Sequence, residues 1–339
     1  MNLQLFSGLP FHDLPFAIAG EADRVLGGVW LGSADPARTP AWPVQAIAMP
    51  LLGTSSAGMQ EIWRCADACS AGESEGIAWR RAGQLLYGVI EVDEAAFAGA
   101  DSPLLAASRE AYRRIFRLLD SQGLPHLWRV WNYLAGINEE VDGLERYRQF
   151  NIGRQDAFIE FARGATGNVP AACAIGLAGG PLSIAFLAGG QPAVPVENPR
   201  QVSAYNYPAE YGPRSPTFSR AALVYPPGQE ILFVSGTASI VGHQTVHPGD
   251  VAGQCRESMA NVRAVVDQAN RLCRSPAYAL NELSYRVYVR LAADFPVVRE
   301  ILAGMLGAAA EIVYVQADIC RHDLLLEIEA MASHKLGNC

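Results

Sequence analysis

The sequence has little positive charge for its size. Its 339 residues contain 26 Lys and Arg against 34 Asp and Glu, a net charge of −8 and an isoelectric point near 5.3. A protein that binds nucleic acid or an anionic membrane needs a basic face. We therefore expect neither nucleic acid nor membrane as a partner. A small anionic substrate is still compatible, because it needs only about two or three local arginines.

Signatures of metal binding, secretion and membrane insertion are also missing. The chain has seven cysteines. Cys65 and Cys69 are spaced as on one helix face, but no second Cys or His pair stands at zinc-site spacing. We expect free thiols in a reducing cytoplasm. The first residues show no basic segment followed by a long apolar run, so neither a signal peptide nor a transmembrane segment is predicted.

Common cofactor and nucleophile motifs are absent as well. The sequence has no Gly-x-x-x-x-Gly-Lys phosphate loop, no Gly-x-Gly-x-x-Gly after a strand and no Gly-x-Ser-x-Gly. His243 and His247 are four residues apart, but they flank Pro248-Gly249, so helical metal geometry is not expected. The sequence predicts no nucleotide, flavin or metal cofactor.

The chain does contain enough apolar residues for a sizeable core: half of its residues are hydrophobic and 18% are charged. Prolines interrupt the first 80 residues, where 44–52 is typical of a strand and 59–68 of a short helix. Farther on, apolar periodicity predicts alternating strands and helices. The helices are expected at 102–119, 144–162, 250–272 and 294–306, and the strands at 83–92, 126–134, 228–236, 283–291, 311–317 and 324–330, with 171–177 and 182–187 as a strand pair.

The two halves of the chain have the same order of elements. Arg129-Val-Trp in one half corresponds to Arg286-Val-Tyr in the other. This order predicts an α/β fold of layered α+β type, with two lobes of mixed sheets and helices on one face of each. We place the lobes at 1–190 and 191–339. The stretch 191–227, rich in Pro, Tyr and Asn, is expected to be an active-site loop.

Several short motifs in residues 228–332 resemble the Rid/YjgF-like superfamily. They are Ser235-Gly236 at a strand end, Gly249-Asp250 before a helix, Gln254 and Asn261 inside it, Tyr288-Val289, and the strand 326–332. The resemblance implies Rid-like lobes with a ligand cleft between adjacent domains, usually in trimers. Imine-deaminating members carry an arginine before the penultimate strand, where this chain has Gly307-Ala-Ala-Ala-Glu-Ile. We therefore do not expect imine deamination.

Five longer motifs occur in a fixed order along nearly the whole chain. They are Trp128–Tyr133 with Ile137-Asn138, Arg146–Arg154, Ser203–Pro208, Arg214–Ala221 and Ser235–His243. Together they resemble the chorismatase family, whose members convert chorismate to pyruvate and a hydroxybenzoate or a dihydroxycyclohexadiene acid. The resemblance implies a cytoplasmic enzyme of secondary metabolism with chorismate as its substrate and no cofactor.

Glu327 is the candidate general acid. Strand alternation places Leu325, Glu327 and Glu329 on one face, and from this pattern alone both glutamates would form a solvated face. The family's acid matches Glu327, and partial burial there should raise its pKa. Seven residues earlier, the hydroxybenzoate-forming branch has a cysteine and the hydrolysing branch an alanine. Here that residue is Cys320, a second catalytic candidate whose alternative is a buried structural role.

The substrate-binding candidates suit a small dianion. Arginine can bond both oxygens of a carboxylate, and tyrosine supplies a hydroxyl donor and an aromatic wall. Surface ion pairs for the arginines and core packing for the tyrosines are the alternatives. The candidates are Tyr147, Arg154, Tyr205, Tyr207, Arg214, Arg220, Gly236, Thr237 and Ala238.

The expected products are 3-hydroxybenzoate and pyruvate, with 4-hydroxybenzoate formed alongside in one branch of the family. Two alternatives are kept: hydrolysis of chorismate to a dihydroxycyclohexadiene carboxylate, and a non-catalytic Rid-like binder of small molecules. A duplicated chain of this kind is expected to be either a monomer that imitates part of a trimer or a homotrimer.

Overall fold

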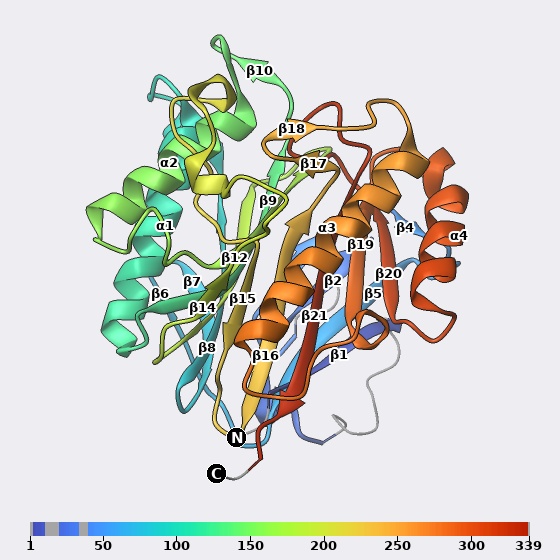
Figure 1. The fold of residues 1–339 in the computed structure, drawn as a ribbon. Helices are drawn as coiled ribbons and strands as arrows, with labels where there is room; N and C mark the ends of the chain where they lie inside the picture. Colours follow the sequence, from blue (N-terminus) through green and yellow to red (C-terminus); the bar gives the residue numbers. More distant parts are fainter. Residues whose placement is uncertain (1–2, 11–19, 34–39, 338–339) are drawn as a thin grey trace.

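The computed structural model describes residues 3–10, 20–33 and 40–337. Two large mixed sheets occupy the centre, with α1 and α2 on one outer side and α3 and α4 on the other (Figure 1). A third sheet is formed by strands from the first 65 residues. The fold is mixed α/β, as predicted.

The first large sheet has the strand order β12-β9-β13-β8-β7-β6. Only β12 and β9 run parallel within it. Its strands are β6 (Ser70–Ser74), β7 (Ile77–Ala82), β8 (Leu85–Val92), β9 (His126–Ala135), β12 (Ala171–Leu177) and β13 (Leu182–Gly189).

The second large sheet has the order β14-β15-β16-β21-β19-β20-β4, so its central strand comes from the far end of the sequence. Only β19 and β20 run parallel. Its strands are β4 (Leu51–Leu52), β14 (Val194–Val196), β15 (Ala221–Val224), β16 (Gln229–Thr237), β19 (Ser284–Val289), β20 (Ile312–Gln316) and β21 (Leu326–Lys335).

The third sheet and two small hairpins complete the strands of the described residues. The third sheet, in the order β1-β5-β2-β3, contains β1 (Leu3–Pro10), β2 (Val25–Gly32), β3 (Val44–Ile47) and β5 (Gly58–Cys65). The hairpins are β10 (Glu140–Val141) with β11 (Leu144–Glu145), and β17 (Ile240–Val241) with β18 (Gln244–Thr245).

The helices begin and end close to the predicted residues. They are α1 (Pro103–Gln122), α2 (Arg146–Glu160), α3 (Val251–Leu272) and α4 (Phe295–Leu306). The Ser102 hydroxyl accepts a hydrogen bond from the Leu105 amide at the start of α1, and Gly123 ends this helix with φ of 64°. Asp250 caps α3 in the same way, through the Gly253 amide.

Three predictions about the strands and cysteines were wrong. Residues 59–68 form strand β5 instead of a helix, because the segment is hydrogen-bonded between β1 and β2. Cys65 therefore ends a strand, so it shares no helix face with Cys69. The runs 171–177 and 182–187 are strands, but they do not pair with each other, because β9 lies between them.

Two further predictions needed smaller corrections. The strand expected at 44–52 is divided into β3 and β4, which join different sheets. The stretch 191–227 is not a loop throughout, because it contains β14, β15 and the 3-10 turns Ala204–Asn206 and Ala209–Tyr211.

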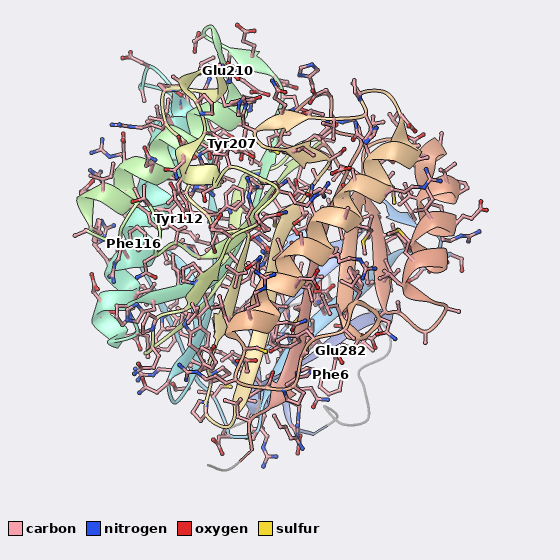
Figure 2. All side chains as sticks on the ribbon, viewed as in Figure 1. Phe6, Tyr112, Phe116, Tyr207, Glu210 and Glu282 are labelled. Carbon is pink, nitrogen blue, oxygen red and sulfur yellow. The ribbon has the colours of Figure 1, made fainter. Side chains whose placement is uncertain are left out.

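Apolar residues fill three layers. Each helix pair packs on its own sheet, and a central core lies between the sheets, with residues such as Trp63, Trp131 and Phe233. In Figure 2, Tyr207 and Glu210 lie at the opposite end of the molecule from Phe6 and Glu282. None of the helices in residues 3–10, 20–33 and 40–337 is both long and apolar enough to cross a membrane. The boundary at residue 191 stays a prediction.

Candidate active site

A cavity of about 430 Å³ lies at the end of the molecule that carries Tyr207. The second large sheet, β12, α2 and the segment 207–220 all contribute to its walls. Its lining contains Glu145, Tyr147, Arg148, Arg154, Ala172, Cys173, Ala174, Tyr207, Tyr211, Pro216, Phe218, Arg220, Gly236, Ala238, Ile240, Gln244, Thr245, Cys320, Arg321, His322, Asp323 and Glu327.

Glu327 lies in the wall of this cavity, on the central strand β21. Leu326 and Ile328, on either side of it, point into the core beneath α3 and α4. Its own side chain points the other way and is only 4% exposed. Burial, followed by the negative charge of Glu329, raises the pKa of Glu327 to about 8, although Arg129 and Arg220 act in the opposite direction. The carboxyl is therefore mostly protonated at neutral pH.

Gly236 provides the space for this carboxyl group. The ladder between β16 and β21 is irregular between Val234 and Thr237, so the chain bulges at Gly236. A Cβ atom at this position would lie 1.8 Å from Oε1 of Glu327. The position of the Glu327 carboxyl on the neighbouring strand thus requires a glycine at this bulge of β16.

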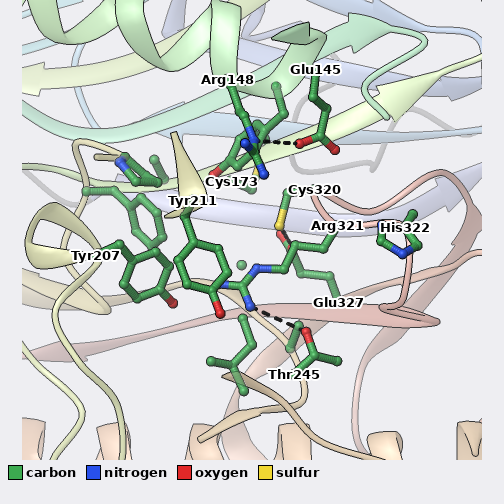
Figure 3. Close-up of a pocket in the computed structure, with 18 of the residues that line it drawn as sticks. Glu145, Arg148, Cys173, Tyr207, Tyr211, Thr245, Cys320, Arg321, His322 and Glu327 are labelled. Atoms are coloured by element: carbon green, nitrogen blue, oxygen red, sulfur yellow. Dashed lines mark hydrogen bonds and ion pairs between the residues drawn. The ribbon is translucent and has the colours of Figure 1, made fainter. Parts of the chain in front are cut away.

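Cys320 is adjacent to Glu327 across the cavity wall (Figure 3). Its Sγ lies 4.0 Å from Oε2 of Glu327. Burial and the neighbouring Glu327 raise the pKa of the thiol to about 12, so the sulfur keeps its proton. Burial also raises the pKa of Tyr147, another lining residue, well above its ordinary value. Both groups face the cavity as neutral hydrogen-bond donors.

Arg154 supplies a buried positive charge to the cavity. It is 1% exposed, and its Nη2 donates to the neutral amide oxygen of Asn151 at 3.0 Å. No partner for its Nε is found in the described part of the chain. Gly153 allows this placement, because its Cα approaches α1 so closely that a Cβ would lie 2.2 Å from the Leu105 carbonyl oxygen. A buried guanidinium with unused donors suits an incoming anion.

Two further arginines present donors to the cavity. Arg220 Nη2 donates to the Val202 carbonyl and the Tyr207 hydroxyl, at 2.7 and 2.8 Å. Arg321 donates to the His243 carbonyl at 2.9 Å, and its guanidinium lies 4.2 Å from the centre of the Tyr211 ring (Figure 3). Nε of Arg220 and Nη2 of Arg321 are both buried without a partner among the described residues.

Most of the residues predicted to form the site come together here. Eight line the cavity, namely Glu327, Cys320, Tyr147, Arg154, Tyr207, Arg220, Gly236 and Ala238. Arg214 does not: its side chain forms an ion pair with Asp156 at 3.4 Å and is 47% exposed. Thr237 is turned into the strand, where its hydroxyl donates to the Ser235 carbonyl. Tyr205, in the first 3-10 turn, lies outside the lining.

Sequence reasoning missed several lining residues, of which Arg321, Tyr211 and His322 carry the most chemistry. Arg321 and His322 directly follow Cys320, so the candidate thiol already marked their segment. Tyr211 lies between two motifs that were identified. In the part of the chain that the structure describes, no group of three or more His, Cys, Asp or Glu is arranged to hold a metal ion.

Comparison with known proteins assigns the family. Residues 61–188 match the family model described as chorismatase FkbO/Hyg5-like, N-terminal. A chorismatase from Streptomyces rapamycinicus is 41% identical over 281 residues, which cover 80% of this chain and 82% of the relative. The chain belongs to the chorismatase family. A 3-hydroxybenzoate synthase from Streptomyces hygroscopicus is 39% identical over 80% of both chains.

Solved structures agree with this membership. A chorismatase crystal structure matches this family member with a TM-score of 0.86 and 33% identity, over 98% of both chains. Smaller proteins match only in part. A Mycobacterium tuberculosis protein described as a member of the YjgF/YER057c/UK114 family, for example, covers 34% of this chain with a TM-score of 0.26 and 24% identity.

Proposed function

We propose that this chorismatase-family protein converts chorismate to 3-hydroxybenzoate and pyruvate, with Glu327 as the general acid. The observation that carries the proposal is a buried carboxyl with a pKa raised to about 8, in a cavity that also contains arginines without carboxylate partners. The relatives named chorismatase and 3-hydroxybenzoate synthase support this choice of substrate and product.

Chorismate fits the charge of the cavity. Its two carboxylates need two cationic regions, and Arg154 and Arg220 come from different walls, α2 and the residue before β15. Arg321 provides a third cation near the 3-10 turns. Tyr147 and Tyr207 add hydroxyl donors. A cavity of about 430 Å³ is in the range usual for small-molecule sites.

The first chemical step is proton transfer from Glu327 to the terminal methylene of the enolpyruvyl group. This forms an oxocarbenium-like carbon, so that the ether oxygen can leave the ring with the bonding electrons as the carbonyl oxygen of pyruvate. The ring hydroxyl on the adjacent carbon displaces the ether oxygen and forms an arene oxide, and the hydroxyl proton passes to the Glu327 carboxylate. One carbon–oxygen bond of the oxide then breaks, its oxygen takes up a proton, and the ring carbon that keeps this oxygen loses one, giving the aromatic product. No water is consumed.

Cys320 fits the second half of this sequence. Its protonated thiol lies beside Glu327 and can donate a hydrogen bond to the oxide oxygen as the ring opens. In this proposal Glu327 gives one proton to what becomes the methyl group of pyruvate and takes up another from the ring hydroxyl, and Cys320 favours aromatisation over capture by water. Formation of 4-hydroxybenzoate in the same cavity would follow if the oxide opened at its other carbon–oxygen bond, or if the ring cation formed on opening rearranged.

Product analysis in water enriched in oxygen-18 tests the proposal. Purified protein should release pyruvate and 3-hydroxybenzoate in equal amounts, with no heavy oxygen in the phenol group. Heavy oxygen in the aromatic product would rule out the intramolecular route. A dihydroxycyclohexadiene carboxylate would instead indicate hydrolysis. Absence of any pyruvate would show that the protein is a non-catalytic binder.

A further inference from the structure

The two corresponding motifs Arg129-Val-Trp and Arg286-Val-Tyr meet at one buried carboxylate, which has no role in the proposed reaction. Both arginines contact the carboxylate of Glu329. Arg129 Nη2 pairs with Oε2, and Arg286 Nη1 lies 3.0 Å from Oε1. Arg129 is 2% exposed, and Arg286 and Glu329 are each 5% exposed. Two buried cations from β9 and β19 thus hold one carboxylate of β21.

Hydroxyl groups and a second carboxylate complete this arrangement. The Tyr288 hydroxyl donates to Oε1 of Glu329 at 3.1 Å, and Arg286 donates to the Tyr133 hydroxyl at 2.9 Å. Arg286 also pairs with Glu61 on β5. We call Glu61, Arg129, Tyr133, Arg286, Tyr288 and Glu329 the buried charge cluster. It contains two carboxyl and two guanidinium groups, and all three main sheets contribute to it, so the Glu329 side chain is held in place between the two arginines.

Glu327 lies next to the cluster, because residues two apart on a strand point to the same face about 7 Å apart. The other titratable groups around Glu327 come from several elements. They are Arg129 on β9, Arg220 before β15, Tyr147 on α2, Cys173 on β12, Cys320 before β21 and its cross-strand neighbour Tyr288 on β19.

Besides Glu329, two of the groups just named, Arg129 and Arg220, act on Glu327 through their charge. Burial raises the pKa of Tyr147, Tyr288, Cys173 and Cys320, which keeps all four neutral. Glu329 opposes ionisation of Glu327, whereas Arg129 and Arg220 favour it. Nη1 of Arg129 still has no hydrogen-bond partner among the described residues. If Glu329 were removed, Arg129 would therefore be free to pair with the carboxyl group of Glu327.

We propose that Glu329 is a positioning residue which, held by Arg129 and Arg286, occupies these arginines and keeps Glu327 in its protonated form. The catalytic consequence of this rests on the proposed function. The protonation state of Glu327 is nevertheless a property of the folded protein, so it can be measured without any substrate.

Carboxyl carbon-13 NMR of protein labelled at glutamate tests this directly. The wild-type protein should show a buried carboxyl that titrates near pH 8 and is missing in Glu327→Gln. In Glu329→Gln, the Glu327 midpoint should fall by about one unit or more, and in Arg129→Gln it should rise. Glu329→Asp should retain the wild-type midpoint more closely than Glu329→Gln does.

Two results would overturn the proposal. One is an unchanged Glu327 midpoint in folded Glu329→Gln. The other is a wild-type protein in which Glu329 rather than Glu327 is the carboxyl that titrates near pH 8. If Glu329→Gln does not fold, the wild-type titration and the Arg129→Gln variant still decide, because an unchanged or lowered midpoint in Arg129→Gln contradicts the proposal.

Pyruvate release gives a second readout that a purely structural role would not change. The alkaline limb of the kcat/KM profile should move to lower pH in Glu329→Gln and to higher pH in Arg129→Gln. A structural role alone would lower stability or raise KM at every pH without moving this limb. If the wild-type protein releases no pyruvate, the proposed function fails, but the NMR titration still decides the role of Glu329.

Discussion

Glu327 and Glu329 lie two residues apart on the same face of β21, yet their surroundings are opposite. Glu329 contacts Arg129, Arg286 and the Tyr288 hydroxyl. Glu327 has a single hydrogen-bonding contact in the described structure, with the Cys320 thiol at 4.0 Å. Both are almost fully buried, so burial alone does not distinguish a structural carboxylate from a proton donor. The partners decide which of the two is ionised.

The same contrast extends to the arginines. In the buried charge cluster each guanidinium pairs with a carboxylate, whereas Arg154, Arg220 and Arg321 in the cavity show no carboxylate partner in the described part of the chain. Removing one partner of a buried pair leaves an uncompensated charge and destabilises the fold, whereas an unpaired buried cation beside a cavity suits an anionic ligand. Substitutions in the buried charge cluster should therefore affect stability, whereas substitutions of the cavity arginines should affect substrate binding.

The largest expected effect is on turnover in Glu327→Gln. The amide keeps the size of the side chain but cannot donate a carboxyl proton, so kcat should fall by ~10³-fold or more, at the upper end of what general acid catalysis contributes. Binding of chorismate should persist, as measured by calorimetry. Turnover close to that of the wild-type protein would remove Glu327 from the proposed role.

Arg286→Met should affect stability instead. The change leaves Glu61 and Glu329 buried with less counter-charge, which should lower the free energy of unfolding by about 3–5 kcal/mol. Urea denaturation followed by circular dichroism measures this loss. Arg117→Met is the control, because Arg117 is 42% exposed and its pairs with Glu75 and Glu110 should contribute at most about 1 kcal/mol. Equal losses in both variants would contradict the contrast between buried and exposed pairs.

Gly236→Ala tests the placement of the acid. The added methyl group would overlap Oε1 of Glu327 and displace the carboxyl, so kcat should fall by ~10²-fold. Gly179→Ala is a matched control, since nothing lies within 4 Å of a Cβ built at Gly179. Assays of pyruvate release compare the two variants. A normal rate in Gly236→Ala would mean that the acid acts from another position.

Arg154→Met and Arg214→Met separate two arginines that the sequence made equivalent. Loss of the buried cation in the cavity should raise KM for chorismate by ~10–100-fold, the effect expected for a charged hydrogen bond. Loss of Arg214 should change KM little, because this side chain is exposed and paired with Asp156. Steady-state kinetics at one pH are sufficient. The reverse order would place a substrate carboxylate outside the cavity.

The smallest effect concerns stability as a function of pH. A carboxyl with a pKa of about 8 in the folded protein and about 4.3 in the unfolded chain retains its proton only when folded between these values. Its contribution to stability is therefore complete below about pH 4.3 and is lost as the pH rises through 8. Glu327→Gln should match the wild-type Tm near pH 4.5 and exceed it by a few degrees at pH 8. A difference independent of pH would show that Glu327 is ionised throughout.

The predictability of the molecule from its sequence differed between segments. Helix α1 was predicted closely, because Ser102, Pro103 and Gly123 determine its ends through local backbone chemistry. Strand β5 was predicted as a helix, because its sequence is compatible with both and only pairing with β1 and β2 selects the strand. Local signals were reliable where caps exist, and they failed where distant partners decide.

The same reasoning applies to the site. Glu327 could be proposed because the family resemblance marked its position, whereas alternation alone favoured a solvated strand face. Burial by the opposite sheet is a long-range property that no pattern within β21 contains. Arg214 and Arg154 had similar sequence signals, and only the three-dimensional course of the chain turns one outward and the other inward. The partners of Glu329 come from β9 and β19, which are distant in sequence from each other, and this explains why the cluster could not be predicted.

The position of β21 in its sheet has a consequence for synthesis of the chain. This strand is inserted between β16 and β19, although the ribosome makes it after both. Until it emerges, two neighbouring strands have open edges, which favour pairing with other chains. The nascent protein should therefore depend on chaperones until late in translation, and Glu327 enters the cavity in the same step that closes the sheet.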